Sequence, residues 1–181
     1  MSDSKAIDRG AADAVLTALR RTRQVREFTD EPVSDAALEA ILEQARWTGS
    51  SMNRQPWTFI VVRKRDDLQR LAELVPNARY VAGSAAAIAI AMGGDNAEWD
   101  AYDEGRAAER ILIAANALGL GAGIGWAVAA ARPEVGQFFS LTQPAFVRTI
   151  ISLGHVTEAA RRPKSAPGTA RRPLKELVRD L

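Results

Sequence analysis

The segment Ser50-Ser51-Met52-Asn53-Arg54-Gln55-Pro56-Trp57 leads directly into the apolar run Trp57-Thr58-Phe59-Ile60-Val61-Val62. Hydroxyl and amide side chains compete with regular backbone hydrogen bonding, so the polar part predicts a loop whose donors and acceptors face something other than the chain. The apolar part is rich in β-branched and aromatic residues, which predicts a strand. Composition alone would also suit a plain connecting loop. We expect Pro56 and Trp57 to anchor the loop to the core.

On the amino-terminal side of this loop, apolar residues recur at helical spacing. They are Ala12, Val15, Leu16 and Leu19 in one segment, and Leu38, Ile41, Leu42 and Ala45 in the next. The spacing predicts a first helix from about Ser4 to Leu19 with one buried stripe. Ser34 is expected to cap the second helix.

Helical and extended patterns alternate in the rest of the chain. The predicted elements are a helix over 66–74, a strand over 85–92, a helix over 102–118, an extended segment after Gly121, a helix over 133–139 and a strand over 146–153. Alanines in the strand 85–92 are expected to let the helix 102–118 pack closely, with Glu104 largely off its apolar face. The interleaving allows a doubly wound parallel sheet or a three-layer sandwich around a mostly antiparallel sheet.

Length and composition limit the possible functions. With 181 residues, 47% of them apolar, the chain 1–181 is expected to form a single domain. The absence of cysteine excludes disulfides and thiolate sites, and the single histidine, His155, predicts no metal site. The first residues lack the features of a leader peptide and the longest apolar run is far shorter than a membrane span. We therefore expect a cytoplasmic protein without a membrane partner.

Basic residues gather in two places, although 24 cations against 22 carboxylates are too balanced to predict nucleic-acid binding. One cluster spans residues 20–26. The other lies in a basic C-terminal extension that begins at about residue 156, and an exposed tail would explain it equally well. Arg23 and Arg26 are three residues apart at a helix end, where their guanidinium groups could converge on one anion. Phosphate matches the paired donors of arginine.

Glycine alternates with other residues in Gly119-Leu120-Gly121-Ala122-Gly123-Ile124-Gly125. This spacing departs from the dinucleotide fingerprint G-x-G-x-x-G, and the segment follows a helix where that fingerprint would precede one. We therefore predict a helix end at Gly119 and a close-packed backbone after it.

Several of these motifs, in this order, resemble the nitroreductase family of FMN enzymes. The family pattern R-S-x-R-x-F, then P-V, a helix and S-x-N-x-Q-P-W before a strand is matched by residues 23–28, 31–33 and 50–57. The resemblance runs from about Ala18 to Leu177. It implies an α+β fold, a three-layer α/β/α sandwich with a mostly antiparallel central sheet.

The resemblance also implies which residues bind FMN. Arg23 and Arg26 would hold the phosphate and ribityl chain, with Gln24 in place of the family's serine. Arg171, in a segment that resembles the family's R-x-P, would return to the phosphate. The flavin ring would contact Ser50, Ser51 and Asn53, commonly across a dimer interface, and the backbone of Gly125 and Trp126 near N5. An amide donor there would stabilise charge on the reduced ring.

The activity implied is an FMN-dependent oxidoreductase that passes hydride from NAD(P)H through flavin N5 to a nitroaromatic, quinone or similar acceptor. The flavin carries the chemistry, so no catalytic side chain is expected. A homodimer with interfacial flavin sites is implied as well. Two alternatives are kept: flavin fragmentation or reductive dehalogenation in the same superfamily, and a flavin-binding or nucleic-acid-binding protein without turnover.

Overall fold

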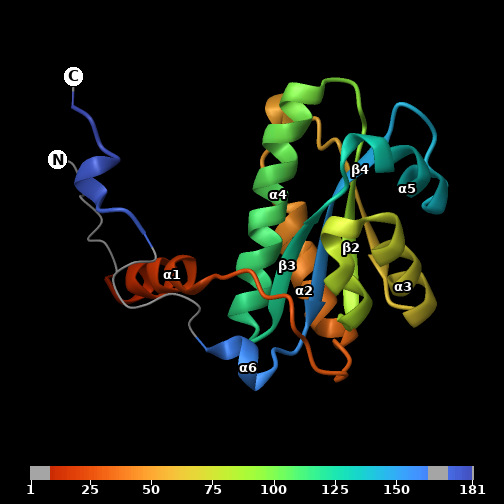
Figure 1. Cartoon of the computed structure of the whole chain (residues 1–181). Helices are drawn as coiled ribbons and strands as arrows, with labels where there is room; N and C mark the ends of the chain where they lie inside the picture. The colour runs from red at the N-terminus through yellow and green to blue at the C-terminus, as the bar shows by residue number, and fades with distance from the viewer. Residues whose placement is uncertain (1–8, 163–170, 181) are drawn as a thin grey trace.

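The computed structural model describes residues 9–162 and 171–180, and its centre is one sheet of four strands (Figure 1). The strands are β1 (Trp57–Val62), β2 (Ala86–Met92), β3 (Gly121–Trp126) and β4 (Phe146–Gly154), in the order β1-β2-β4-β3. All three pairings are antiparallel, which excludes the doubly wound alternative. No helix among the described residues is both long enough and apolar enough to cross a bilayer.

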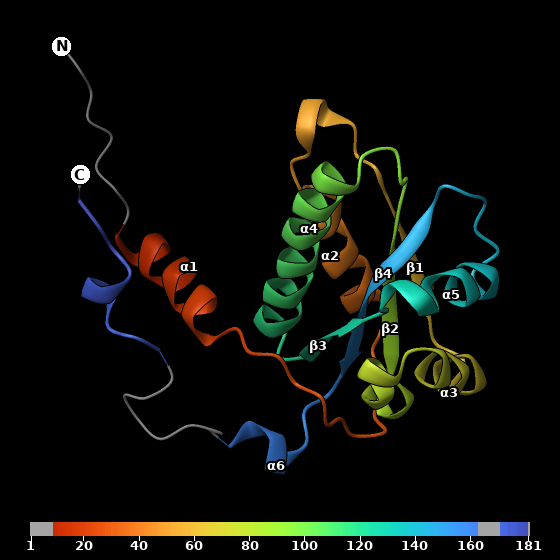
Figure 2. The same ribbon diagram turned by 45° about the horizontal axis from the view of Figure 1, so that its top comes forward.

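Helices cover both faces of the sheet, as Figure 2 shows. On one face lie α2 (Asp35–Arg46) and α4 (Ala97–Ala117), and on the other lie α3 (Arg65–Leu74), the 3-10 segment η2 (Pro76–Gly83) and α5 (Arg132–Phe138). The predicted α+β three-layer sandwich is therefore confirmed. The boundaries of α3, α5, β1, β2 and β4 lie within about one residue of those predicted, and β3 begins where the extended segment was expected.

The two faces of β2 carry side chains of different size, because successive residues of a strand point to opposite sides. Ile88, Ile90 and Met92 face α2 and α4, whereas the alanines at 87, 89 and 91 face α3, η2 and α5. Our expectation that these alanines bring α4 close is wrong. Most small residues in the core cluster on the α4 side belong to α4, and they are Ala107, Ala108, Ala114 and Ala115, together with Ala86 at the start of β2.

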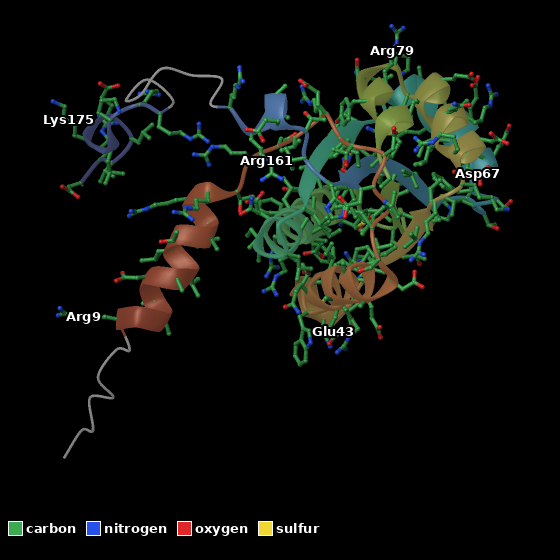
Figure 3. The ribbon with its side chains drawn as sticks, turned by 90° about the horizontal axis from the view of Figure 1, so that it is seen from below. Arg9, Glu43, Asp67, Arg79, Arg161 and Lys175 are labelled. Carbon is green, nitrogen blue, oxygen red and sulfur yellow. The ribbon has the colours of Figure 1, made fainter. Side chains whose placement is uncertain are left out.

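The first helix, α1 (Arg9–Arg21), does not bury the stripe that its sequence predicts. Its apolar side chains Val15, Leu16 and Leu19 are all exposed. Figure 3 shows the reason, since α1 stands away from the sheet with Arg9 at its far end. The predicted start at Ser4 lies outside the described residues, and the buried stripe is a wrong prediction for one isolated chain.

The long helix α4 begins earlier than predicted and buries acidic side chains. Asn96 caps it by accepting a hydrogen bond from the Trp99 amide at 3.0 Å. Glu104 is only 2% exposed, so our placement of this residue off the buried face is wrong. A buried carboxylate requires a partner, and Glu104 has one in Arg148.

Candidate functional site

The segment Gln24–Arg26 lies along the outer edge of β3. The Val25 amide donates to the Ala122 carbonyl at 2.7 Å, and the Ile124 amide donates to Gln24 Oε1 at 3.2 Å. A short parallel bridge joins Gln24 to Ala122. The segment thus covers backbone groups that an edge strand would otherwise expose. Gln24, which stands where the family has serine, uses its side chain to hold this edge.

Alternate glycines of β3 make this close approach possible. A Cβ at Gly123 would lie 2.3 Å from the Val25 carbonyl oxygen, and a Cβ at Gly125 would lie 2.3 Å from Ala78 Cβ. Any larger residue would push away either the Gln24–Arg26 segment or η2. The prediction of a close-packed glycine backbone is confirmed. We call residues Gln24–Arg26, Tyr80 and β3 the glycine corner.

Arg26 in the glycine corner is exposed and lies over an aromatic ring. Its guanidinium carbon lies 5.2 Å from the centroid of the Tyr80 ring. Within the described residues, no carboxylate lies at ion-pair distance from Arg26. The Tyr80 hydroxyl is buried, and no hydrogen bond to it is found among residues 9–162 and 171–180. Burial raises the pKa of this hydroxyl, and the charge of Arg26 opposes that effect.

Arg23, the other predicted phosphate ligand of this segment, is bound differently. Its Nη1 donates to the carbonyls of Arg20 at 2.5 Å and Thr22 at 2.8 Å. Carbonyls at the end of a helix lack partners within the helix, so Arg23 serves as a cap for α1. Of the two arginines, Arg26 is therefore the one that donates to no described carbonyl or carboxylate, and its described neighbour is the Tyr80 side chain.

The polar loop Ser50–Trp57 contains three non-glycine residues with positive φ. These are Met52, Asn53 and Gln55, at 51°, 55° and 49°. Such conformations cost free energy and persist where the surroundings hold them. Hydrogen bonds do so here, among them one from the Gln55 amide to Ser50 Oγ at 2.8 Å and one from the Ser51 amide to Asp103 Oδ2 at 3.2 Å.

Buried carboxylates on α4 anchor this loop and its neighbours. Asp100 Oδ2 accepts from the Gly94 amide at 2.9 Å, and its other oxygen lies 3.6 Å from Arg54 Nη2. Glu104 Oε2 accepts from Arg148 Nε at 2.7 Å. Asp100, Asp103 and Glu104 share one face of the helix because they are three and four residues apart. We call these three acids and the Ser50–Trp57 loop the acidic ridge.

Arg148 connects the acidic ridge to the end of β3. Its guanidinium carbon lies 5.3 Å from the centroid of the Trp126 ring and 5.6 Å from that of Phe146. Trp126 is about half exposed and follows Gly125, so both predicted flavin contacts lie where β3 leaves the sheet. The fold brings Gln24, Arg26, Gly125 and Trp126 onto or beside one strand.

The loop and the start of β3 lie toward opposite ends of α4 (Figure 1). Ser51 is bound by Asp103, whereas β3 begins just after the helix ends at Ala117. At 1.5 Å per residue, α4 rises roughly 21 Å between Asp103 and Ala117. One chain therefore does not gather Ser50, Ser51 and Asn53 around Arg26.

Arg171 belongs to a C-terminal segment that runs on the α1 side of the molecule. Figure 3 shows Lys175, in the 3-10 turn η4 (Leu174–Glu176), on the far side of the short helix α6 (Glu158–Arg161) from the sheet. Arg172 in the same segment pairs with Glu176 at 3.5 Å. The role of Arg171 at the phosphate stays a prediction.

Sequence reasoning missed Tyr80, Arg148 and the buried acids of α4. Each acquires its role from a partner distant in the chain, as Glu104 does from a residue 44 positions away. Asp100, Asp103 and Glu104 did carry a signal, because they lie at helical spacing on the side that continues into Ala107 and Ile111.

Comparisons with known proteins agree on one family. Residues 19–89 match the model of the nitroreductase family. A protein of Archaeoglobus fulgidus, provisionally named NADH dehydrogenase/NAD(P)H nitroreductase, is 30% identical over 141 residues, which are 74% of this chain and 80% of that protein. One of Methanothermobacter thermautotrophicus with the same provisional name is 32% identical over 111 residues, or 60% of this chain. There the match spans only 58% of the relative's length.

A solved structure gives the same result for the fold and adds a ligand. It is a provisionally assigned nitroreductase from Desulfovibrio desulfuricans in complex with FMN, 30% identical to this chain. The two structures superpose with a TM-score of 0.75 over 92% of this chain and 96% of the other.

Proposed function

This chain belongs to the nitroreductase family, and from that membership we propose that it is an FMN-dependent oxidoreductase. It would pass hydride from NAD(P)H through flavin N5 to a nitroaromatic, quinone or similar acceptor. The observation that carries this proposal is the glycine corner, where Arg26 faces no described carboxylate beside a strand whose alternate residues have no side chains.

The residues of the glycine corner fit FMN. A phosphate would pair with the guanidinium of Arg26, and charge-assisted bonds of this kind are among the strongest in proteins. The Ile124 amide, which points away from β4, is taken by Gln24. Amides alternate in direction along a strand, so the Trp126 amide points the same way, beyond the covering segment. We propose this amide as the donor near N5.

Bound FMN would supply reversible two-electron chemistry, so the protein needs no side chain that acts as acid or base. The residues of this chain would bind and orient the cofactor. Arg23, Arg26 and Arg171 would hold its phosphate, and Ser50, Ser51 and Asn53 would contact its ring. The half-exposed Trp126 indole, fixed by Arg148, would form part of the wall where donor and acceptor enter.

We further propose a homodimer in which the acidic ridge of one copy completes the glycine corner of the other. Large apolar side chains are exposed around the ridge, with Trp47 at 64%, Met52 at 76% and Tyr102 at 74%. The stripe of α1 is exposed as well. A soluble monomer rarely exposes so many such groups, and a second copy would cover them.

The proposal is tested by purifying the protein, recording its visible spectrum with added FMN, and titrating it with NADH and NADPH without oxygen. We expect a bound flavin spectrum that bleaches with one or both nucleotides and returns when a quinone is added. A colourless protein that neither binds FMN nor bleaches with reductant would reject it.

A further inference from the structure

The contact between Arg26 and Tyr80 places an exposed cation against an aromatic face, with no described carboxylate at ion-pair distance. A carboxylate partner would occupy the N–H donors of the guanidinium and cancel its charge. An aromatic face attracts the cation electrostatically and leaves the donors at the guanidinium edge available. Arg23 shows the contrast, because its Nη1 already donates to two carbonyls.

The position of Tyr80 is itself fixed by β3. Tyr80 lies in η2, whose Ala78 packs onto Gly125. Tyr80 Cε2 lies 3.3 Å from the point that a Cβ at Gly123 would occupy, so the ring rests against a strand position without a side chain. Because the Val25 carbonyl reaches the same glycine, the segment that carries Arg26 and the ring beneath it share one support.

The chemistry of the ring also suits this role. The Tyr80 hydroxyl is buried, and burial raises its pKa, so the phenol stays neutral across the physiological range. A neutral phenol neither repels a phosphate as a carboxylate would nor adds a second cation. The one charge that the glycine corner presents beside this ring is that of Arg26.

We infer that Tyr80 is a positioning residue for Arg26, whose ring holds the guanidinium in the orientation that binds the phosphate of FMN. This inference rests on the FMN site proposed above. Its consequence is specific, because Tyr80 contributes to the affinity for the phosphate and not to the affinity for the flavin ring.

The experiment compares FMN with riboflavin, which has the same ring and ribityl chain but no phosphate. Flavin-free full-length protein is titrated with each ligand by fluorescence quenching, for the wild type, Tyr80→Leu, Tyr80→Phe, Arg26→Ala and the double variant Arg26→Ala/Tyr80→Leu. We expect Tyr80→Leu to weaken FMN binding roughly fivefold and riboflavin binding less than twofold. Tyr80→Phe keeps the ring and is expected to match the wild type.

The double variant separates positioning from packing. If Tyr80 acts through Arg26, then Tyr80→Leu has no further effect on FMN binding once Arg26 is alanine. Equal losses for both flavins, an undiminished loss in the Arg26→Ala background, or a loss in Tyr80→Phe as large as in Tyr80→Leu would each overturn the inference. If Tyr80→Leu does not fold, Tyr80→Met supplies the variant without a ring. A wild type that binds neither flavin would instead refute the proposed function.

Discussion

The glycine corner and the acidic ridge are built on opposite physical principles. In the glycine corner, neighbouring segments lie directly against the backbone of β3 because three of its residues have no side chains, and Arg26 lies over a ring. In the acidic ridge, a loop with positive φ angles is held by buried carboxylates, which are matched in turn by arginines. The first region should therefore be sensitive to side-chain volume, and the second to loss of charge.

The largest effect is expected from breaking a buried ion pair of the acidic ridge. Glu104→Ala leaves Arg148, whose side chain is only 12% exposed, without its carboxylate. Removing one partner of a buried pair costs about 3–5 kcal/mol of unfolding free energy. Urea unfolding measures this loss of free energy, and Glu109→Ala on the exposed face of α4 is the matched control. Equal stability of the two variants would show that charge does not hold the ridge.

In the glycine corner, one added methyl group should also lower the free energy of unfolding, by less than the loss of Glu104. Gly123→Ala places a Cβ 2.3 Å from the Val25 carbonyl, which must move. We expect a loss of about 1–3 kcal/mol in urea unfolding together with weaker FMN binding, because Arg26 moves with Val25. The control is Gly105→Ala on α4, where nothing lies within 4 Å and helix propensity favours alanine. A harmless Gly123→Ala would remove the basis for calling this region close-packed.

A milder change should loosen the polar loop without unfolding the ridge. Asp103→Asn keeps an acceptor for the Ser51 amide but removes the charge that strengthens the bond. We expect about 0.5–1.5 kcal/mol less stability and faster hydrogen exchange at residues 50–55, with exchange in residues 24–26 unchanged. Faster exchange in both regions would mean that they are not separate units.

The smallest effect is expected from an exposed charge outside both regions. A hydrogen bond from Arg46, and a weaker contribution from the hydrogen bond of Trp47, lower the pKa of Glu43 from 4.5 to about 2. Since the folded pKa lies below the unfolded one, this contribution to stability is present above about pH 4.5 and is lost as the pH falls toward 2. The stability difference between the wild type and Glu43→Gln should therefore shrink over that window. Glu43→Gln should bind FMN at neutral pH with the affinity of the wild type. A different affinity would contradict our placement of Glu43 outside the site.

Much of the fold could be predicted because its elements carry strong local patterns. Leu38 and Ile41 give α2 its period, and the β-branched residues of β4 mark a strand. The position of α1 could not be predicted in this way. Amphipathic spacing shows that Val15 and Leu19 form an apolar face but does not show which surface covers it.

The candidate site was predictable only where a motif is continuous in sequence. Arg26 and the Ser50–Trp57 loop were found from such motifs. Tyr80 was not found, since an aromatic residue in a polar turn gives no sign of the arginine above it. The burial of Glu104 on α4 depends likewise on its partner Arg148, which belongs to strand β4.

Our central claim is that the glycine corner and the acidic ridge of two different copies form one FMN site. Two variants test it, Arg26→Glu in the glycine corner and Asn53→Trp in the loop. A homodimer of either variant is expected not to bind FMN. Co-expressed with different affinity tags and isolated as a mixed dimer, they leave one site with both walls intact. We predict one FMN per mixed dimer, bound as in the wild type. A mixed dimer that binds no FMN would show that both walls come from the same chain and would contradict the account.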